Sequence, residues 1–127
     1  MRMSRVFWIS LFLTIGLNAQ PTFDIHLEPL TIQGLGGLQS YAYAQHNGHW
    51  VFIGGRLDGL HRRQPWATFD QAGHNTQIYV VDYHSDSVWT ASIQSLPPSL
   101  QDQLSSTNTE FHQDGNELII IGGYGYS

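Results

Sequence analysis

The amino-acid sequence predicts an all-β protein built from short antiparallel strands. The composition is rich in glycine (13 residues) and aromatics (13%) but only 12% charged, which is unlike the Lys/Glu-rich composition of helical bundles. Beyond residue 20, short runs of β-branched and aromatic residues alternate with Gly, Asn, Asp and Pro, and none keeps helical spacing for three turns. The length of 127 residues allows one small domain at most.

Seven of these runs are predicted strands. Asn47-Gly48 and the turn at 114–116 lie between successive runs, and both favour tight hairpins because Asn and Gly adopt positive φ at low cost. A short helical turn over Ser99–Ser105 is the one competing element. The predicted strands are Phe23–Ile32, Tyr41–Gln45, Trp50–Ile53, Gln77–Asp82, Val88–Ile93, Thr109–Gln113 and Leu118–Ile121.

The first nineteen residues are predicted to be a secretory signal peptide. Two arginines precede an apolar run over 6–17, which is shorter than the roughly 20 residues of a membrane-spanning helix. We place the cleavage between Ala19 and Gln20, because a cut one residue later would put Pro21 at the new N-terminus. A buried strand or membrane anchor is the alternative. We therefore expect the mature protein to be secreted, periplasmic or on the cell surface.

The charge of the mature chain limits its partners. It keeps three arginines against ten acidic residues and has no lysine, so its formal charge is −7. Nucleic acids and anionic membranes attract basic proteins, so we expect neither as a partner after leader removal. The absence of cysteine excludes disulfides, thiolate metal sites and thiol catalysis. We expect no cofactor.

An internal repeat joins the two halves of the mature chain. Residues 43–56 align without gaps with residues 111–124, at an offset of 68. Each copy contains an aromatic-started strand, a polar turn, an apolar strand and a Gly-Gly pair. Glycines at the end of a strand let a neighbouring sheet approach the backbone, and a following Trp can cover the seam between sheets.

These features resemble the kelch repeat, in which a hydrophobic run ends in Gly-Gly and is followed by a Tyr-containing strand closing in Asp and then a Trp. The resemblance covers roughly residues 38–127, and the period of 68 exceeds the kelch period of about 50, so longer loops are expected. It implies antiparallel four-stranded β-propeller blades, with about one and a half blades present. The matching residues are Gly54, Gly55, Tyr79, Asp82, Trp89, Gly122 and Gly123.

The resemblance also implies a domain organisation. Residues 38–127 would form the partial blades, and residues 20–37 would be a lead-in strand or a strand that closes the ring. Because a propeller needs four to eight blades, we expect the chain to be the N-terminal part of a longer secreted bacterial protein. An isolated chain of this kind should be oligomeric or poorly soluble. A small two-sheet β-sandwich is the alternative.

The implied blade topology places the long loops 56–75 and 96–108 on one face. Loops on a rigid scaffold commonly carry function. The first loop holds all three mature arginines and two aromatics, a mixture suited to stacking on a sugar or pairing with a carboxylate. In the alternative, Asp58 and Asp70 pair with the arginines and the aromatic residues pack the loop down. The candidate binding residues are Arg56, His61, Arg62, Arg63, Trp66 and His74.

Other polar residues are expected to be structural. His46 and His49 flank a turn with no third ligand fixed nearby, so no metal site is predicted. No nucleophile motif of the Gly-x-Ser-x-Gly type occurs, and no catalytic residue is predicted. Asp82 is expected to cap the turn after its strand, and Trp89 to fill a seam between blades.

We therefore expect a binding or scaffolding module that recognises protein or glycan. The alternative is a sugar-acting kelch enzyme, either sialic-acid mutarotase-like or galactose-oxidase-like, whose site is completed by further blades. The oxidase type needs a cysteine for its cross-linked tyrosine, and this chain has none. A structural segment without activity of its own is a third possibility.

Overall fold

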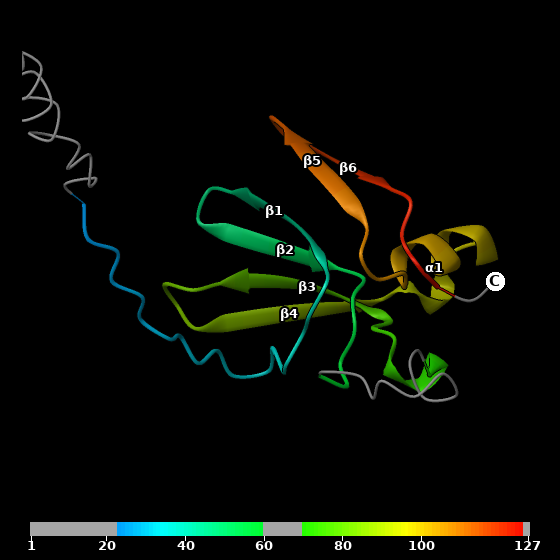
Figure 1. Cartoon of the computed structure of the whole chain (residues 1–127), viewed down its shortest axis with the longest axis horizontal. Coiled ribbons are helices and arrows are strands. Elements are labelled where there is room, and N and C mark those ends of the chain that lie inside the picture. Colours follow the sequence, from blue (N-terminus) through cyan, green and yellow to red (C-terminus); the bar gives the residue numbers. More distant parts are fainter. Residues whose placement is uncertain (1–22, 60–69, 126–127) are drawn as a thin grey trace, which may run out of the picture.

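The computed structural model describes residues 23–59 and 70–125, and these ranges form two antiparallel sheets (Figure 1). The first sheet has the order β1-β2-β3-β4 and the second pairs β5 with β6. The all-β prediction is confirmed, and six predicted strands match to within one residue at each end. The strands are β1 (Ala42–His46), β2 (His49–Ile53), β3 (Gln77–Asp82), β4 (Ser87–Ser92), β5 (Glu110–Asp114) and β6 (Glu117–Ile121).

Within residues 23–59 and 70–125, helical structure is confined to the connections. Helix α1 (Pro98–Leu104) occupies the predicted helical turn, and its first residue is a proline, which suits a position that needs no backbone donor. Two 3-10 turns, η1 (Gln71–Gly73) and η2 (Ile93–Ser95), precede β3 and follow β4.

The predicted strand Phe23–Ile32 is the exception. In the described ranges it belongs to neither sheet, and its apolar side chains are largely exposed. Its alternating pattern suits a strand, but a strand also needs a neighbouring edge for its backbone hydrogen bonds. Leu30 and Ile32 instead line a cavity of about 310 Å³ against the first sheet. The ring-closing role stays a prediction.

The sequence repeat is also a structural repeat. Strands β5 and β6 begin and end 68 residues after β1 and β2. The register is kept as well, because Ala42 pairs with Ile53 as Glu110 pairs with Ile121. The two Gly-Gly pairs share positive φ angles of 70° and 83° in the first copy and 67° and 109° in the second. The β5–β6 hairpin is therefore the start of a second unit of the same kind.

Both faces of the four-stranded sheet are apolar, so each needs cover. We call one the aliphatic face and the other the aromatic face. The β5–β6 hairpin packs against β1, where Ala44, Val51 and Val80 of the aliphatic face border a cleft shared with Leu118. On the aromatic face, the Tyr43 ring contacts Phe111 of the hairpin at a centroid distance of 4.9 Å. By register, the aliphatic face carries Ala42, Ala44, Val51, Ile53, Ile78 and Val80 with Trp89 and Ala91 of β4, and the aromatic face carries Tyr43, Trp50, Phe52, Tyr79, Val81 and Val88.

Candidate functional site

The long connections gather at one edge of the sheet, as the topology predicted. Strands β2 and β4 both end at this edge, where η1 and α1 lie (Figure 1). The short turns after β1 and β3 lie at the opposite edge. We call the first edge the loop edge; its described residues are 54–59, 70–76, 93–109 and 122–125.

Arg56 is buried at the base of the first long loop, with 2% of its side chain exposed. Its Nε and Nη2 atoms donate to the two carboxylate oxygens of Asp58 at 2.8 and 2.5 Å. Nη2 also donates to the backbone carbonyl of Asp70 at 3.0 Å. Arg56 and Asp58 form a bidentate pair at the first end of the loop, as the alternative interpretation expected for Asp58, and the bond to the Asp70 carbonyl ties that end to the second. The Asp70 carboxylate has another role, accepting from the Ala72 amide to cap η1.

His74 lies beside Arg56, since the two residues form an antiparallel β-bridge. Burial of the imidazole, which is 8% exposed as a residue, lowers its pKa, and the Arg56 charge lowers that pKa further while Asp58 acts in the opposite direction. The structure thus brings together two of the six candidate binding residues. His61, Arg62, Arg63 and Trp66 lie outside the described residues, and the binding role of all six stays a prediction.

Asn75 is a further loop-edge residue that sequence reasoning missed. It is fully buried and donates from Nδ2 to the carbonyls of Gly54 (3.0 Å) and Gln77 (2.7 Å). Its Oδ1 accepts from the Gln77 amide at 2.9 Å. These bonds fasten the loop exit to the first Gly-Gly pair. An asparagine two residues before a predicted strand was the available signal.

The first Gly-Gly pair is where the second unit approaches the first. The Gly55 amide donates to the Ser106 carbonyl at 2.9 Å. A Cβ atom on Gly54 would lie 2.5 Å from that same oxygen, so a side chain there is excluded. The close backbone approach that the Gly-Gly pattern predicted is present at this position.

Asp82 has the structural role predicted for it, whereas Trp89 does not fill a seam in the described structure. Asp82 Oδ1 accepts from the His84 amide at 2.9 Å and Oδ2 from the Ser85 hydroxyl at 2.7 Å, so it caps the turn. These bonds, the Ser85 bond first, lower the pKa of the carboxyl. Trp89 is 52% exposed and contacts the His49 ring at a centroid distance of 6.0 Å. No sheet covers Trp89 within the described ranges, so the expected seam is not formed there.

A polar hollow of about 290 Å³ opens at the loop edge between α1 and the second Gly-Gly pair. Gln103 borders it and donates from Nε2 to the Gly122 carbonyl at 2.7 Å. A carboxylate, an amide and hydroxyls on its wall can donate to and accept from the hydroxyl groups of a ligand. Sequence reasoning singled out Gly122 and Gly123 as structural residues but missed the polar side chains of this hollow. The lining is Ser99, Asp102, Gln103, Ser106, Gly122, Gly123 and Gly125.

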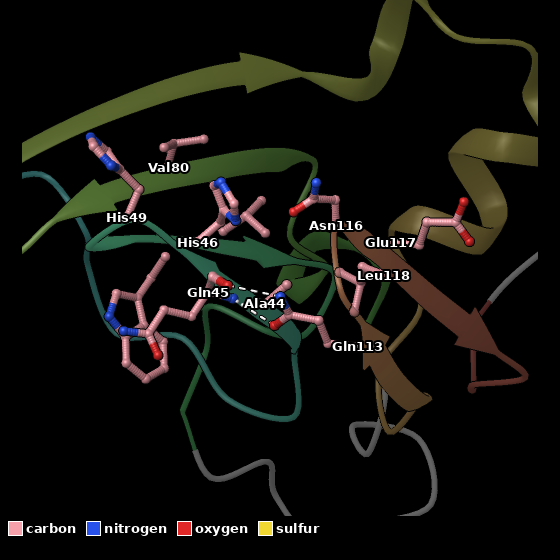
Figure 2. A pocket seen from close by; sticks show the side chains of 11 residues that line it. Ala44, Gln45, His46, His49, Val80, Gln113, Asn116, Glu117 and Leu118 are labelled. Atoms are coloured by element: carbon pink, nitrogen blue, oxygen red, sulfur yellow. Dashed lines mark hydrogen bonds between the residues drawn. The ribbon is translucent and has the colours of Figure 1, made fainter.

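An apolar cleft of about 320 Å³ separates the β5–β6 hairpin from the first sheet (Figure 2). Gln45 and Gln113 are joined by two hydrogen bonds across it, and His46 and His49 also line it. In the part of the chain that the structure describes, no three His, Asp or Glu side chains gather as a metal site requires.

Comparison with known proteins found no significant similarity. No family model matches it, and neither a curated protein nor a solved structure is significantly similar. Among residues 23–59 and 70–125, no helix has the length and apolar character to cross a membrane.

Proposed function

We propose that this chain belongs to an exported kelch-type β-propeller that recognises a glycan or a protein through its loop edge. The observation that carries the proposal is the repeat of 68 residues, in which a second unit packs on the first with equivalent residues aligned. A fold that stacks such units presents the same set of loops from every unit at one edge. The kelch-type residues and the gathering of both long loops at that edge support it.

The chemistry of the loop edge favours a hydroxyl-rich ligand. The polar hollow offers the Asp102 carboxylate, the Gln103 amide and the Ser99 hydroxyl to such a ligand. The sequence of the first long loop also contains Trp66 and the three arginines. A tryptophan suits stacking on a sugar, and arginines suit pairing with a carboxylate. Carbohydrate is therefore the ligand class to test first.

The test is a glycan array of neutral, sialylated and uronate-containing oligosaccharides, probed with the processed full chain. We expect binding to a defined subset, lost in Asp102→Asn and in Trp66→Ala. Asp86→Asn removes the same charge at the opposite edge and should bind as wild type. Absence of binding to every glycan, or an Asp102→Asn variant that binds normally, would overturn the glycan assignment.

Blade identity has its own test. An experimental structure of the processed chain gives the rotation that superposes residues 42–53 on residues 110–121. Closure of four to eight units requires about 45–90° around a single axis. A rotation outside this range, or one with a large shift along the axis, would contradict the propeller.

Export is tested at the N-terminus of the protein after expression in a bacterium. We expect the purified chain to begin at Gln20 and to be found outside the cytoplasm. Intact mass spectrometry of the periplasmic fraction checks both points. An unprocessed chain that begins at Met1 would contradict the signal-peptide prediction.

A further inference from the structure

His74 lies where the first long loop meets the second unit. On the side of the first unit it forms a β-bridge with Arg56, whose guanidinium donates to Asp58 and to the Asp70 carbonyl. On the side of the second unit, a Cβ atom placed on Gly125 would lie 3.8 Å from His74 Cε1. The imidazole therefore borders both the buried Arg56–Asp58 pair and the chain that follows the second Gly-Gly pair.

The hydrogen bonds next to His74 also join the two units. Directly after it, the Asn75 amide donates to the Gly55 carbonyl at 3.0 Å, and the Gly55 amide donates to the Ser106 carbonyl at 2.9 Å. A Cβ atom on Gly125 would also lie 3.5 Å from the Cβ atom of Ser106, so Gly125 is close to both Ser106 and His74. A displacement of His74 therefore acts on the bonds that hold the loop edge together.

The surroundings of the imidazole favour its neutral form. His74 is 8% exposed, and Arg56, which is 2% exposed, already brings a positive charge into the same buried place. Burial lowers the pKa of His74, and the Arg56 charge lowers it further against the opposing effect of Asp58. A proton on His74 would add a second positive charge where both oxygens of the Asp58 carboxylate already accept from Arg56.

Few other groups around His74 can respond to a moderate change of pH. Besides Arg56 and Asp58, the ionisable side chains on the neighbouring elements are Asp70, which precedes η1, and Tyr124 of the second unit. Of these side-chain types, only imidazole ordinarily changes its charge between pH 7.5 and 5. His74 is also the one histidine among the described residues of the loop edge.

We propose that His74 is a pH-sensitive switch at the junction of the two units. The neutral imidazole keeps the loop edge assembled, and protonation in mildly acidic solution expels the ring and opens the junction. In the open form the imidazole is in water and takes up a proton below about pH 6.5, so acid favours that form. Release of a glycan at acidic pH rests on the function proposed above, whereas the opening itself requires no ligand.

Hydrogen exchange of the processed full chain tests the switch, measured by NMR at pH 7.5 and 5.0 with rates corrected for the intrinsic effect of pH. We expect the amides of Gly55 and Asn75 to lose protection by about ten-fold at pH 5.0, because the open form binds one proton more. The Gln45 amide, which is bonded to Gln113 at the opposite edge, should keep its protection. An equal loss at Gln45 would show a response of the whole chain and would overturn the proposal.

Two histidine variants assign the response to His74. His74→Gln is neutral at every pH and should make the protection of Gly55 independent of pH between 7.5 and 5.0. His112→Gln is the matched control, because it removes an exposed histidine of β5 and should respond to acid as wild type does. Circular dichroism establishes that each variant is folded. A folded His74→Gln chain that still loses protection in acid would overturn the proposal.

Titration of the His74 imidazole by NMR in the unchanged chain provides a test that needs no variant. We expect the ring to ionise below pH 6.5 and the Gly55 amide to lose protection over the same pH range. Ionisation of the ring with no change at Gly55 would overturn the proposal. Because neither measurement uses a glycan, failure of the switch is distinguishable from failure of the glycan assignment.

Discussion

Gln45 and Gln113, which occupy the same position in two units 68 residues apart, bind each other across the cleft. The backbone amide of Gln45 donates to Gln113 Oε1 at 2.9 Å, and Gln113 Nε2 donates to the backbone carbonyl of Gln45 at 2.8 Å (Figure 2). The Gln113 side chain thus satisfies both backbone groups of an edge residue in β1. It does what a neighbouring strand would do, and it ties the second unit to the first at matching residues.

Replacing Gln113 should loosen this junction without unfolding the sheet. Gln113→Ala removes both bonds, together with the bond from Nε2 to the Gly115 carbonyl. We expect a loss of about 1 kcal/mol, or roughly five-fold faster hydrogen exchange at the Gln45 backbone amide. Exchange measured by mass spectrometry checks this. Gln94→Ala is the control, because Gln94 is exposed and its side chain makes no hydrogen bond within the described ranges. Unchanged protection at Gln45 would contradict the prediction.

The two equivalent glycines Gly54 and Gly122 form a matched pair of sites. Both have positive φ, so alanine at either costs about 1–2 kcal/mol of backbone strain. A Cβ atom on Gly122 would enter open space, whereas a Cβ atom on Gly54 would meet the Ser106 carbonyl. Gly54→Ala should therefore lose about 1–3 kcal/mol more than Gly122→Ala in urea denaturation. Equal losses would mean that the two units are not packed as described.

His74 should make stability fall in mildly acidic solution. Its pKa is lowered in the folded protein, so the unfolded chain takes up a proton first as the pH drops below about 6.5. The stability that the neutral imidazole contributes is complete above that pH and is lost as the pH falls through the lowered pKa. His74→Gln should flatten the curve of thermal midpoint against pH between 7.5 and 5. His112→Gln, at an exposed position, should leave the curve unchanged.

Asp82 should also make the stability of the fold decrease as the pH falls, but over a more acidic range than His74. Its carboxylate accepts hydrogen bonds from Ser85 and His84, and its folded pKa is lowered. The stability it contributes is present above about pH 4 and is lost as the pH falls through that lowered value. Asp82→Asn should therefore reduce stability at pH 7 and make the decrease of stability at acidic pH less steep. Asp86→Asn changes the same charge in the same turn, and a similar effect from it would contradict the role of the hydrogen bonds.

The positions of the strands could be predicted because their causes are local. The alternation of residues such as Val80 and Val81, and turn residues such as Asn47 and Gly48, depend only on neighbours along the chain. Phe23–Ile32 failed as a strand because pairing depends on a partner edge. Trp89 is exposed because its cover would have to come from another sheet. The polar hollow escaped prediction because α1 and the second Gly-Gly pair meet only in space.

The sequence by itself determined the all-β class, six strands, the helical turn and the repeat of 68 residues. Each follows from periodicity and from the backbone preferences of glycine and asparagine. Only the tertiary structure decided that Asp58 is the partner of Arg56, that Asn75 fastens the loop, and that the hairpin packs against β1 through Gln113. Those outcomes depend on which groups are desolvated together, and desolvation is a property of the packed chain rather than of any segment of it.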